Sequence, residues 1–488
     1  MSTAGDTDTI DATPAEPAST EAAAKPAGTS TNRRQPFPKG FLDSISTGWA
    51  EHPDTVPAAR EQAPYAAARR AAVSAAFAGK RLVVPAGSLA TRSNDTDYPF
   101  RAHSAFAHLT GWANDAEPDS VLVFQPTADG HDVTLYFRER ADRTTSEFYS
   151  DATIGEFWIG PRPPLASVAA DLGIATAHID TFDSFDDDIV VDEDDELTRF
   201  VSELRLVKDD YEIAQLRLAV EVTAKGFDDI VAELPRIIEH PRGERVVEGV
   251  FHQRARSDGN WEGYDTIAAS GPHACYLHWT RNDGPVVPGD LILIDAGAEV
   301  DSLYTADITR TLPVSGTFSE VQRRVYETVR EAADAAFAAA RPGVKFRAVH
   351  EAAMQVIALR TAEWGFLPVT AEEALDADDG GQHRRYMVHG TSHHLGLDVH
   401  DCAQARRDMY YDGLLEPGMV FTIEPGLYFQ IDDLTVPEEY RGIGVRIEDD
   451  ILMTDAGAVS LTGDIPRTAD EVEAWIARLR TGPADASR

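Results

Sequence analysis

The chain has 488 residues, 43% of them hydrophobic, which excludes a wholly disordered or fibrous protein and leaves room for two or three domains. Its 82 acidic and 44 basic residues give a formal net charge of −38. This charge disfavours nucleic acid and anionic membranes as partners, because both would be repelled. Part of the acidity could instead bind metal ions.

The N-terminal sequence and the cysteine content indicate a cytoplasmic protein. Cys275 and Cys402 are too few for a disulfide framework or a four-cysteine zinc site. Residues 1–31 lack the basic and apolar regions of a signal peptide, and the Arg33-Arg34 pair is not followed by the apolar run of a twin-arginine signal. No segment approaches the roughly 18 apolar residues of a membrane span.

Composition and periodicity divide the chain into four segments. These are a disordered acidic tail rich in Ala and Pro over 1–40, an α/β domain over 41–204, a second domain over 205–475 and a C-terminal tail over 476–488. In the first domain, the predicted elements are strands at 81–85, 121–124 and 133–137 and a helix within 58–78.

Several later stretches have clear local signals. Residues 180–196 contain ten acidic and no basic residues, so we expect a solvated loop. A helix is predicted to open near Asp209, and Ser319 and Gln322 form the capping-box pattern of a helix over 319–340. The remaining predictions are an amphipathic helix over 351–364 and a loop insertion over 371–382.

The second domain contains a weak internal repeat. Residues 288–297 and 417–426 align without a gap, and each copy is a Pro-Gly turn, an apolar strand, a carboxylate and a glycine. Each copy is followed by a second strand with another carboxylate, Asp307 in one half and Glu448 in the other. The repeat therefore predicts two related halves that face each other, each offering two acidic side chains.

The acidic residues of this repeat lie next to apolar runs, where a buried carboxylate needs a compensating charge or hydrogen bonds. Asp295 and Glu424 end the first strands of the two copies. One explanation is an ion pair with Arg310 or Arg446. A metal site is the favoured interpretation, because four such acids occur together with a histidine cluster.

That cluster places four histidines within twelve residues, at His389, His393, His394 and His400. Competing catalytic motifs are missing from the sequence. His350-Glu351 lacks the second histidine of the zinc-protease helix motif, and there is no GxSxG, Walker A or strand-linked GxGxxG pattern.

With these motifs the sequence resembles the Xaa-Pro aminopeptidases (aminopeptidase P) of the pita-bread metallopeptidases, which also include prolidase and methionine aminopeptidase. The matching segments are 291–297, 306–311, 389–401, 418–428 and 440–450, with 92–101, 109–111 and 277–282 favouring aminopeptidase P within the family. The resemblance covers about residues 55–475. It implies an α/β (α+β) chain with a creatinase/prolidase-like, aminopeptidase P-like domain over 41–204. A pita-bread catalytic domain with a pseudo-twofold repeat would follow over 205–475.

The resemblance also implies a dinuclear metal centre. The family's five ligands fall on Asp295, Asp307, His393, Glu424 and Glu448. Asp307 and Glu448 would bridge the two metals, Asp295 would hold one, and His393 with Glu424 the other. Two divalent cations would balance the four carboxylates. Oxygen-dominated ligation with one imidazole favours Mn²⁺, with Co²⁺, Fe²⁺ or Zn²⁺ as alternatives.

The mechanism implied by the resemblance is attack of a metal-bridging hydroxide on the peptide carbonyl, with Glu424 as proton shuttle. His278 and His400 would stabilise the tetrahedral intermediate, and His389 would line the proline pocket. Three further family positions, which hold the metal ligands or the nucleophile, fall on Tyr264, Tyr428 and Arg446.

Two departures from the family pattern stand out. Asp295 and Asp307 are twelve residues apart instead of the usual eleven, and we expect a hairpin turn within 299–305 to absorb the extra residue. His394 stands where the family has an aromatic residue, and we expect it to be structural because it would point away from its neighbour His393 on a strand. Cys275 is expected to be a buried small residue.

The first domain contributes one further expectation. Asp95 and Trp158 match positions that, in the family's tetramers, approach a neighbour's active site. The resemblance thus favours a homodimer or homotetramer.

Three functions compete on this basis. The favoured one is an aminopeptidase that acts on peptides with proline at the second position. Prolidase, which cleaves only Xaa-Pro dipeptides, shares the chemistry and differs in the room beyond the proline. A catalytically inactive binding module is the third, but such relatives lose metal ligands, whereas this chain keeps all five residue types.

Overall fold

The computed structural model describes residues 36–52 and 55–480. Most of the predicted N-terminal tail lies outside these residues, and its last part leads into helix α1 (Lys39–Ile45). Helix α13 (Ala469–Arg480) continues beyond the predicted boundary at 475. Residues 476–480 are therefore helical, contrary to the predicted tail, because Ile476 and Trp475 are buried in the core.

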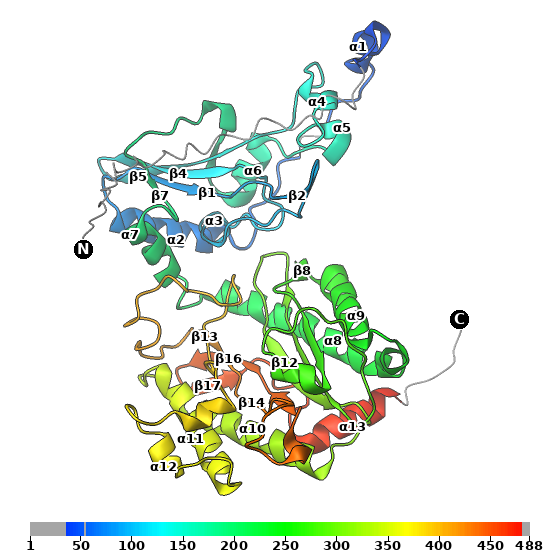
Figure 1. The fold of residues 1–488 in the computed structure, drawn as a ribbon. Helices are drawn as coiled ribbons and strands as arrows, with labels where there is room; N and C mark the ends of the chain where they lie inside the picture. Colours follow the sequence, from blue (N-terminus) through cyan, green and yellow to red (C-terminus); the bar gives the residue numbers. More distant parts are fainter. Residues whose placement is uncertain (1–35, 53–54, 481–488) are drawn as a thin grey trace, which may run out of the picture.

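The N-terminal domain is built on a five-stranded sheet in the order β6-β5-β4-β1-β7 (Figure 1). The three predicted strands are present as β1 (Leu82–Pro85), β4 (Val121–Thr127) and β5 (Gly130–Phe137). The predicted helix is α2 (Ala63–Ala76), which starts with a proline in its first turn. The other larger elements of this domain are α3 (Ser104–Thr110), α6 (Leu165–Leu172) and β6 (Ala175–His178).

The acidic stretch 180–196 is not entirely the solvated loop that we expected. Ile189 and Val190 form strand β7 (Ile189–Val190), which pairs in parallel with β1. Asp194 then caps α7 (Asp195–Glu203) by accepting hydrogen bonds from two backbone N–H groups of its first turn. The two apolar residues of β7 and the Asp194 N-cap thus give this stretch regular structure despite its many charges.

The second domain begins with α8 (Asp210–Glu239), where Asp209 and Glu212 form a capping box. The predicted Ser319–Gln322 capping box is confirmed at the start of α10 (Glu320–Ala339). Helix α11 (Arg347–Glu363) starts four residues before its predicted beginning. The predicted insertion holds a short helix, α12 (Ala371–Ala374), and leads into η3 (Gln382–Arg385).

The internal repeat is confirmed as two antiparallel strand pairs. β10 (Leu291–Ala296) pairs with β12 (Ile308–Pro313), and β13 (Val420–Ile423) pairs with β16 (Asp449–Thr454). Helices α8 and α9 (Gly243–Asp258) lie beside the first pair, and α10 and α11 lie on the side of the second pair (Figure 1). The strands that complete these sheets are β9 (Ile267–Ser270) and β17 (Gly457–Ser460).

The remaining elements are short. They are β2 (Thr91–Ser93), β3 (Thr96–Asp97), α4 (Glu147–Ser150), α5 (Glu156–Ile159), η1 (Ile179–Thr181), β8 (Trp261–Glu262), η2 (Gly271–Cys275), β11 (Ala298–Glu299), β14 (Gly426–Tyr428), η4 (Glu438–Tyr440) and β15 (Gly444–Arg446). Within residues 36–52 and 55–480, no helix is long and apolar enough to cross a membrane.

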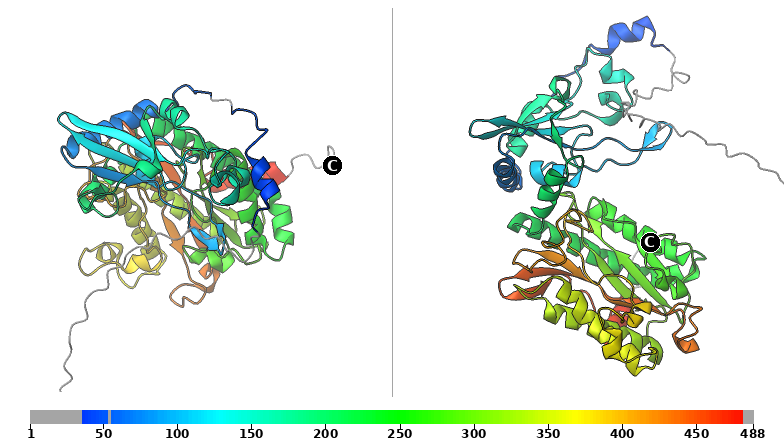
Figure 2. Two further views of the ribbon diagram at one scale, coloured as in Figure 1. Left: turned by 90° about the horizontal axis from the view of Figure 1, so that it is seen from above. Right: turned by 60° about the vertical axis from the view of Figure 1, so that its left-hand side comes forward.

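Charged side chains join the two domains, which Figure 2 shows as separate bodies connected through α7 and α8. Arg69 of the first domain lies 3.3 Å from Glu212 of α8, and Arg101 lies 2.6 Å from Glu299 in β11. Arg101 also donates a hydrogen bond to the backbone oxygen of Leu397, within the histidine cluster between His394 and His400. The N-terminal domain therefore contacts β11 and the histidine-cluster segment of the second domain directly.

Candidate metal centre and active site

A cavity of about 510 Å³ lies between the two halves of the repeat. Ten of the side chains predicted from the sequence line it: Tyr264, His278, Asp295, Asp307, His389, His393, His400, Glu424, Arg446 and Glu448. Tyr428 lies behind this wall, with its hydroxyl 2.8 Å from His389 Nε2. Residues separated by up to 184 positions thus meet at one site, as the repeat predicted.

Strand register places the two acids of the first half side by side. Asp295 in β10 pairs with Thr309 of β12, and Asp307 directly precedes β12. Because side chains alternate along strands, Asp295 and Asp307 share one face of the pair. The Tyr264 hydroxyl joins them, at 2.7 Å from Asp295 Oδ1 and 2.5 Å from Asp307 Oδ1.

A hairpin turn lies between these two acids, where we expected the extra residue to be absorbed. Glu299 bridges to Thr305 across the turn, and Leu303 adopts a left-handed conformation with φ of 68°. A non-glycine residue rarely adopts this conformation, so the turn is locally strained. The β10–β12 register is continuous from Leu291 to Ala296, and both acids line the cavity.

The second half mirrors the first. Glu424 directly follows β13 and Glu448 directly precedes β16, and the pairing of Ile423 with Asp449 brings the two glutamates opposite each other. A backbone hydrogen bond links the two halves: the Glu448 N–H donates to the Thr309 carbonyl oxygen at 3.1 Å.

His393 completes the candidate ligand set. Its Nε2 lies 3.2 Å from Asp307 Oδ2 and 3.7 Å from Glu424 Oε1. Its Nδ1 lies 3.1 Å from the backbone oxygen of His394, which favours a proton on Nδ1 and leaves Nε2 as the ligand atom. Ligand atoms of Asp307, His393 and Glu448 lie within 4.8 Å of one another, a spacing that suits a shared metal ion.

The electrostatics of these acids fit divalent cations. Burial, then repulsion from Asp307, raises the pKa of Glu448 well above its ordinary value, and burial raises that of Glu424 to about 8. Glu448 is 1% exposed, and its Oε1 has no hydrogen-bond partner among the described residues. A buried, unpaired carboxylate oxygen is costly unless a cation compensates it, so the donor set fits the predicted metals.

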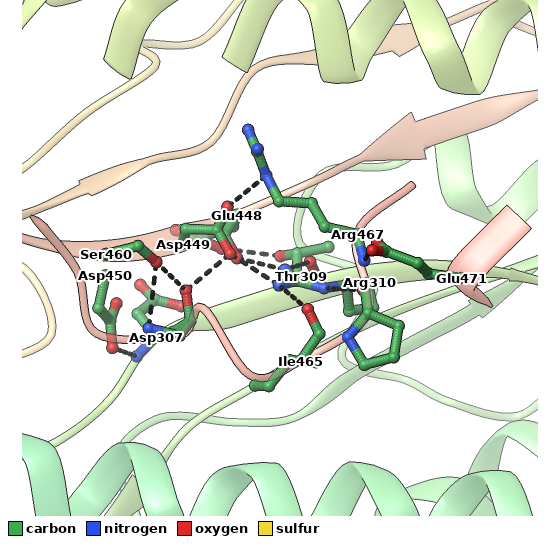
Figure 3. A network of polar contacts seen from close by, with 12 residues as sticks. Asp307, Thr309, Arg310, Glu448, Asp449, Asp450, Ser460, Ile465, Arg467 and Glu471 are labelled. Carbon is green, nitrogen blue, oxygen red and sulfur yellow. Dashed lines mark hydrogen bonds and ion pairs between the residues drawn. The ribbon is translucent and has the colours of Figure 1, made fainter. Parts of the chain in front are cut away.

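Within residues 36–52 and 55–480, the alternative explanation, ion pairing with arginine, holds for Asp295 alone of the four acids. Arg446 Nη2 lies 2.5 Å from Asp295 Oδ2, and its Nε donates to Thr309 Oγ1 at 3.1 Å. Arg310 instead pairs with Asp449 at 2.7 Å and donates to the Glu448 backbone oxygen (Figure 3). Arg446 thus orients Asp295, and the side chains of Asp307, Glu424 and Glu448 have no arginine partner in the described part of the chain.

Three histidines surround the acids at different depths. His389 is largely buried, and burial together with Arg446 lowers its pKa to about 3, so it is neutral at physiological pH. His278 and His400 are exposed side chains on the cavity wall, and the His400 ring lies edge-on to His393 at 4.5 Å. The two exposed rings can therefore reach a ligand that enters the cavity.

His394 and Cys275 are structural, as we expected. The His394 ring is fully buried, stacks on Phe346 at 4.6 Å, meets Tyr410 edge-on and is not among the side chains that line the cavity. Cys275 is buried, and burial raises the pKa of its thiol to about 12, so it is a poor nucleophile.

Asp95 and Trp158 do not line the cavity of their own chain. Asp95 is exposed in the turn between β2 and β3. Trp158 in α5 is 57% exposed, and its indole N–H donates to the Tyr149 backbone oxygen at 2.9 Å.

Sequence reasoning missed two residues of the centre. The Thr309 hydroxyl donates to Glu448 Oε2 at 2.7 Å, and Asp450 accepts from the Asp307 backbone N–H at 3.2 Å (Figure 3). A usable signal existed for Asp450, because strand alternation puts it on the same face as Glu448. The role of Thr309 depends on contacts between the halves and has no local signal.

Comparisons with known proteins agree with this geometry. The model of metallopeptidase family M24 matches residues 214–455, and that of the aminopeptidase P N-terminal domain matches 66–197. Xaa-Pro aminopeptidase 1 of Streptomyces coelicolor is 50% identical over 464 residues, covering 90% of this chain and 92% of that protein. Xaa-Pro aminopeptidase of Escherichia coli is 33% identical, covering 84% and 97%.

Solved structures give the same assignment. Aminopeptidase PepP of Pseudomonas aeruginosa superposes with a TM-score of 0.74 at 29% identity, covering 86% of this chain and 99% of that one. The fold and site define a pita-bread metallopeptidase with an added N-terminal α/β domain. The chain belongs to metallopeptidase family M24, in its branch of Xaa-Pro aminopeptidases (aminopeptidase P). It is accordingly a hydrolase of the metallo-aminopeptidase class.

Proposed function

We propose that this enzyme removes the N-terminal residue from peptides that carry proline at the second position. The observation that carries the proposal is the convergence of all five family ligand residues, Asp295, Asp307, His393, Glu424 and Glu448, on one cavity. Relatives named Xaa-Pro aminopeptidase that cover nine-tenths of the chain support the same specificity.

We assign two divalent cations to these ligands, most simply Mn²⁺, because oxygen donors dominate the set. When bound, such cations lower the pKa of water and polarise a carbonyl group. Asp295 is held by Arg446 and Tyr264, so its carboxylate is oriented before any ligand binds. Glu448 is oriented in the same way by Thr309.

Glu424 is the proposed proton shuttle. Its side chain lies at the cavity wall beside His393, and its raised pKa suits a group that must both accept and release a proton near neutral pH. It would take a proton as the nucleophile forms and return it to the leaving proline nitrogen. His278 and His400 would donate hydrogen bonds to the carbonyl oxygen as negative charge develops there.

Neutral His389 would contact the proline ring. Its Nδ1 lies 2.6 Å from the Gly390 backbone oxygen and its Nε2 contacts the Tyr428 hydroxyl, so the ring is fixed and presents an uncharged face. Apolar side chains of Leu277 and Val399 line the same cavity and suit an apolar residue.

We further propose a cytoplasmic homodimer or homotetramer in which Asp95 and Trp158 approach the neighbour's cavity. The support is the exposure of Trp158, which a partner could cover. Sedimentation of wild type and Trp158→Ala would test this, and an active wild-type monomer would refute it.

The deciding experiment for function is hydrolysis of matched peptides with Mn²⁺ present. Release of the first residue from Xaa-Pro-Xaa, with little release from Xaa-Ala-Xaa, is expected. Cleavage restricted to Xaa-Pro dipeptides would indicate prolidase instead. Glu424→Ala should abolish turnover while Glu416→Ala, an exposed glutamate outside the cavity, should not.

A further inference from the structure

Glu244 in the first turn of α9 is a fully buried carboxylate with no role in the metal centre. Its side chain is 0% exposed. It accepts four hydrogen bonds, all from the segment 270–284. Oε1 faces the Ser270 backbone N–H at 2.8 Å and His273 Nδ1 at 2.7 Å. Oε2 faces the Gly284 backbone N–H at 2.6 Å and the Trp279 indole N–H at 3.0 Å.

This number of donors matches the chemistry of an ionised carboxylate. Such a group has about four acceptor sites and no donor, so the four contacts saturate it. Burying a charge without such partners would be strongly unfavourable. A first-turn position in α9 also favours negative charge, because the positive end of the helix dipole lies there.

The segment that Glu244 organises carries His278. Trp279, which donates to Glu244, directly follows His278, and its ring stacks on His273 at a centroid distance of 3.9 Å. On the other side of His278, the Cys275 backbone oxygen accepts a hydrogen bond from Gln430 at 2.9 Å. His278 is therefore held between two anchored points although its own side chain is exposed.

The packing around Gly284 shows how closely the segment fits Glu244. A Cβ atom at Gly284 would come within 2.8 Å of Glu244 Oε2 and 2.7 Å of the His273 ring. The Gly284 carbonyl also accepts from the Glu244 backbone N–H at 3.2 Å, so the two residues contact each other twice. Both ends of the segment are thus fixed to one turn of α9.

We propose that Glu244 is a positioning residue for His278: through these four hydrogen bonds it sets where the His278 ring stands in the substrate cavity. The inference rests on the proposed function, because His278 is assigned there to the carbonyl oxygen. Glu244 itself touches neither substrate nor metal ligands.

A double-mutant cycle with Glu244→Gln and His278→Ala tests the proposal. The glutamine is isosteric, but its NH₂ group would oppose two of the four donors and shift the segment. Each single variant should lower kcat/KM for Xaa-Pro-Xaa by about tenfold or more. The double variant should have the same kcat/KM as His278→Ala, because displacing the segment has no further effect once the His278 ring has been removed. A double variant whose loss in kcat/KM is the product of the two single-variant losses would overturn the proposal.

Two controls separate this role from a general loss of stability. Glu212→Gln changes another buried carboxylate, which contacts His108 and Tyr304 at the domain junction, and its effect should multiply with that of His278→Ala. If Glu244→Gln does not fold, Trp279→Phe can replace it, because it removes one of the four donors to Glu244 and keeps an aromatic ring at that position. The double-mutant cycle of Trp279→Phe with His278→Ala then tests the proposal.

Hydrogen exchange on metal-free protein gives a readout independent of activity. The Ser270 and Gly284 amides should exchange faster in Glu244→Gln, while those of β12 stay protected. Unchanged exchange at both amides would refute the positioning role. Wild-type protein that leaves Xaa-Pro-Xaa intact would refute the proposed function, whereas multiplicative losses in an active enzyme would refute this inference alone.

Discussion

Lys208→Met should strongly destabilise the enzyme, because it breaks a buried ion pair behind the active-site loop. Lys208 lies between α7 and α8 and donates to Asp401 Oδ2 at 3.1 Å, with side-chain exposures of 0% and 1%. Removing one partner of a buried pair costs about 3–5 kcal/mol. Arg205 still contacts Asp401 at 3.0 Å in the variant, so we expect the lower limit, about 3 kcal/mol.

Urea unfolding at pH 7 measures this loss, and its pH dependence supplies a second check. Burial alone would raise the pKa of Asp401, but the charges of Arg205 and Lys208 hold this pKa below its ordinary value. A lowered folded-state pKa gives stability that is present above the unfolded pKa of about 3.9 and is lost on acidification. The penalty of Lys208→Met should therefore be full at pH 7 and shrink only below about pH 4, as acidification protonates Asp401.

The matched control is Lys225→Met, which breaks an exposed pair with Glu221 and should cost less than about 0.5 kcal/mol. Asp401→Asn combined with Lys208→Met should recover part of the loss, because the buried carboxylate that lost Lys208 is gone and Arg205 keeps Asp398 as a partner at 3.3 Å. A Lys208→Met penalty below about 1 kcal/mol, or one that grows on acidification, would refute this reasoning.

Three other predictions concern the metal centre and its surroundings. Thr309→Val should weaken Mn²⁺ binding by about 10–100-fold in calorimetry, because Glu448 and Arg446 lose the hydroxyl group that both contact. Thr361→Val within α11 is the control and should leave Mn²⁺ affinity unchanged. Equal Mn²⁺ affinities of Thr309→Val and wild type would count against the prediction. Metal-free protein should lose thermal stability as the pH rises from about 4.5 to about 8, because the pKa of Glu424 is raised to about 8 and the folded state therefore binds a proton that the unfolded state releases. The gain in stability from Mn²⁺ should then increase with pH, and a pH-independent gain would contradict this. His394→Phe should leave stability unchanged or raise it by about 1 kcal/mol, because neither buried ring nitrogen has a hydrogen-bond partner within the described chain; a loss above 1 kcal/mol in urea would show a hidden partner.

Local patterns predicted much of the fold and most of the site. Asp295 and Glu424 could be assigned because a carboxylate directly after a buried strand is energetically costly and therefore informative. The Ser319 capping box fixed a helix start to the residue, since that signal is complete within four positions. The repeat predicted that the two pairs of acids would meet, because related halves place equivalent strand ends together.

Long-range contacts could not be predicted in this way. Glu244 contacts residues 26 to 40 positions away, and nothing around it in the sequence distinguishes it from other helix acids. Strand β7 has only two residues and lies inside an acidic stretch, so local composition gave no strand signal. It forms because it pairs with the distant strand β1. The clamp of Lys208 on Asp401 likewise joins residues 193 positions apart. Such residues are found from register and packing between distant segments.

Titration of metal-stripped enzyme with Mn²⁺, while release of the first residue from Xaa-Pro-Xaa is followed, tests the central claim most directly. Five ligand side chains around one cavity predict that hydrolysis is absent without metal and reaches its plateau at about two ions per chain. Full hydrolysis by metal-free protein, or none after two ions have bound, would contradict the account.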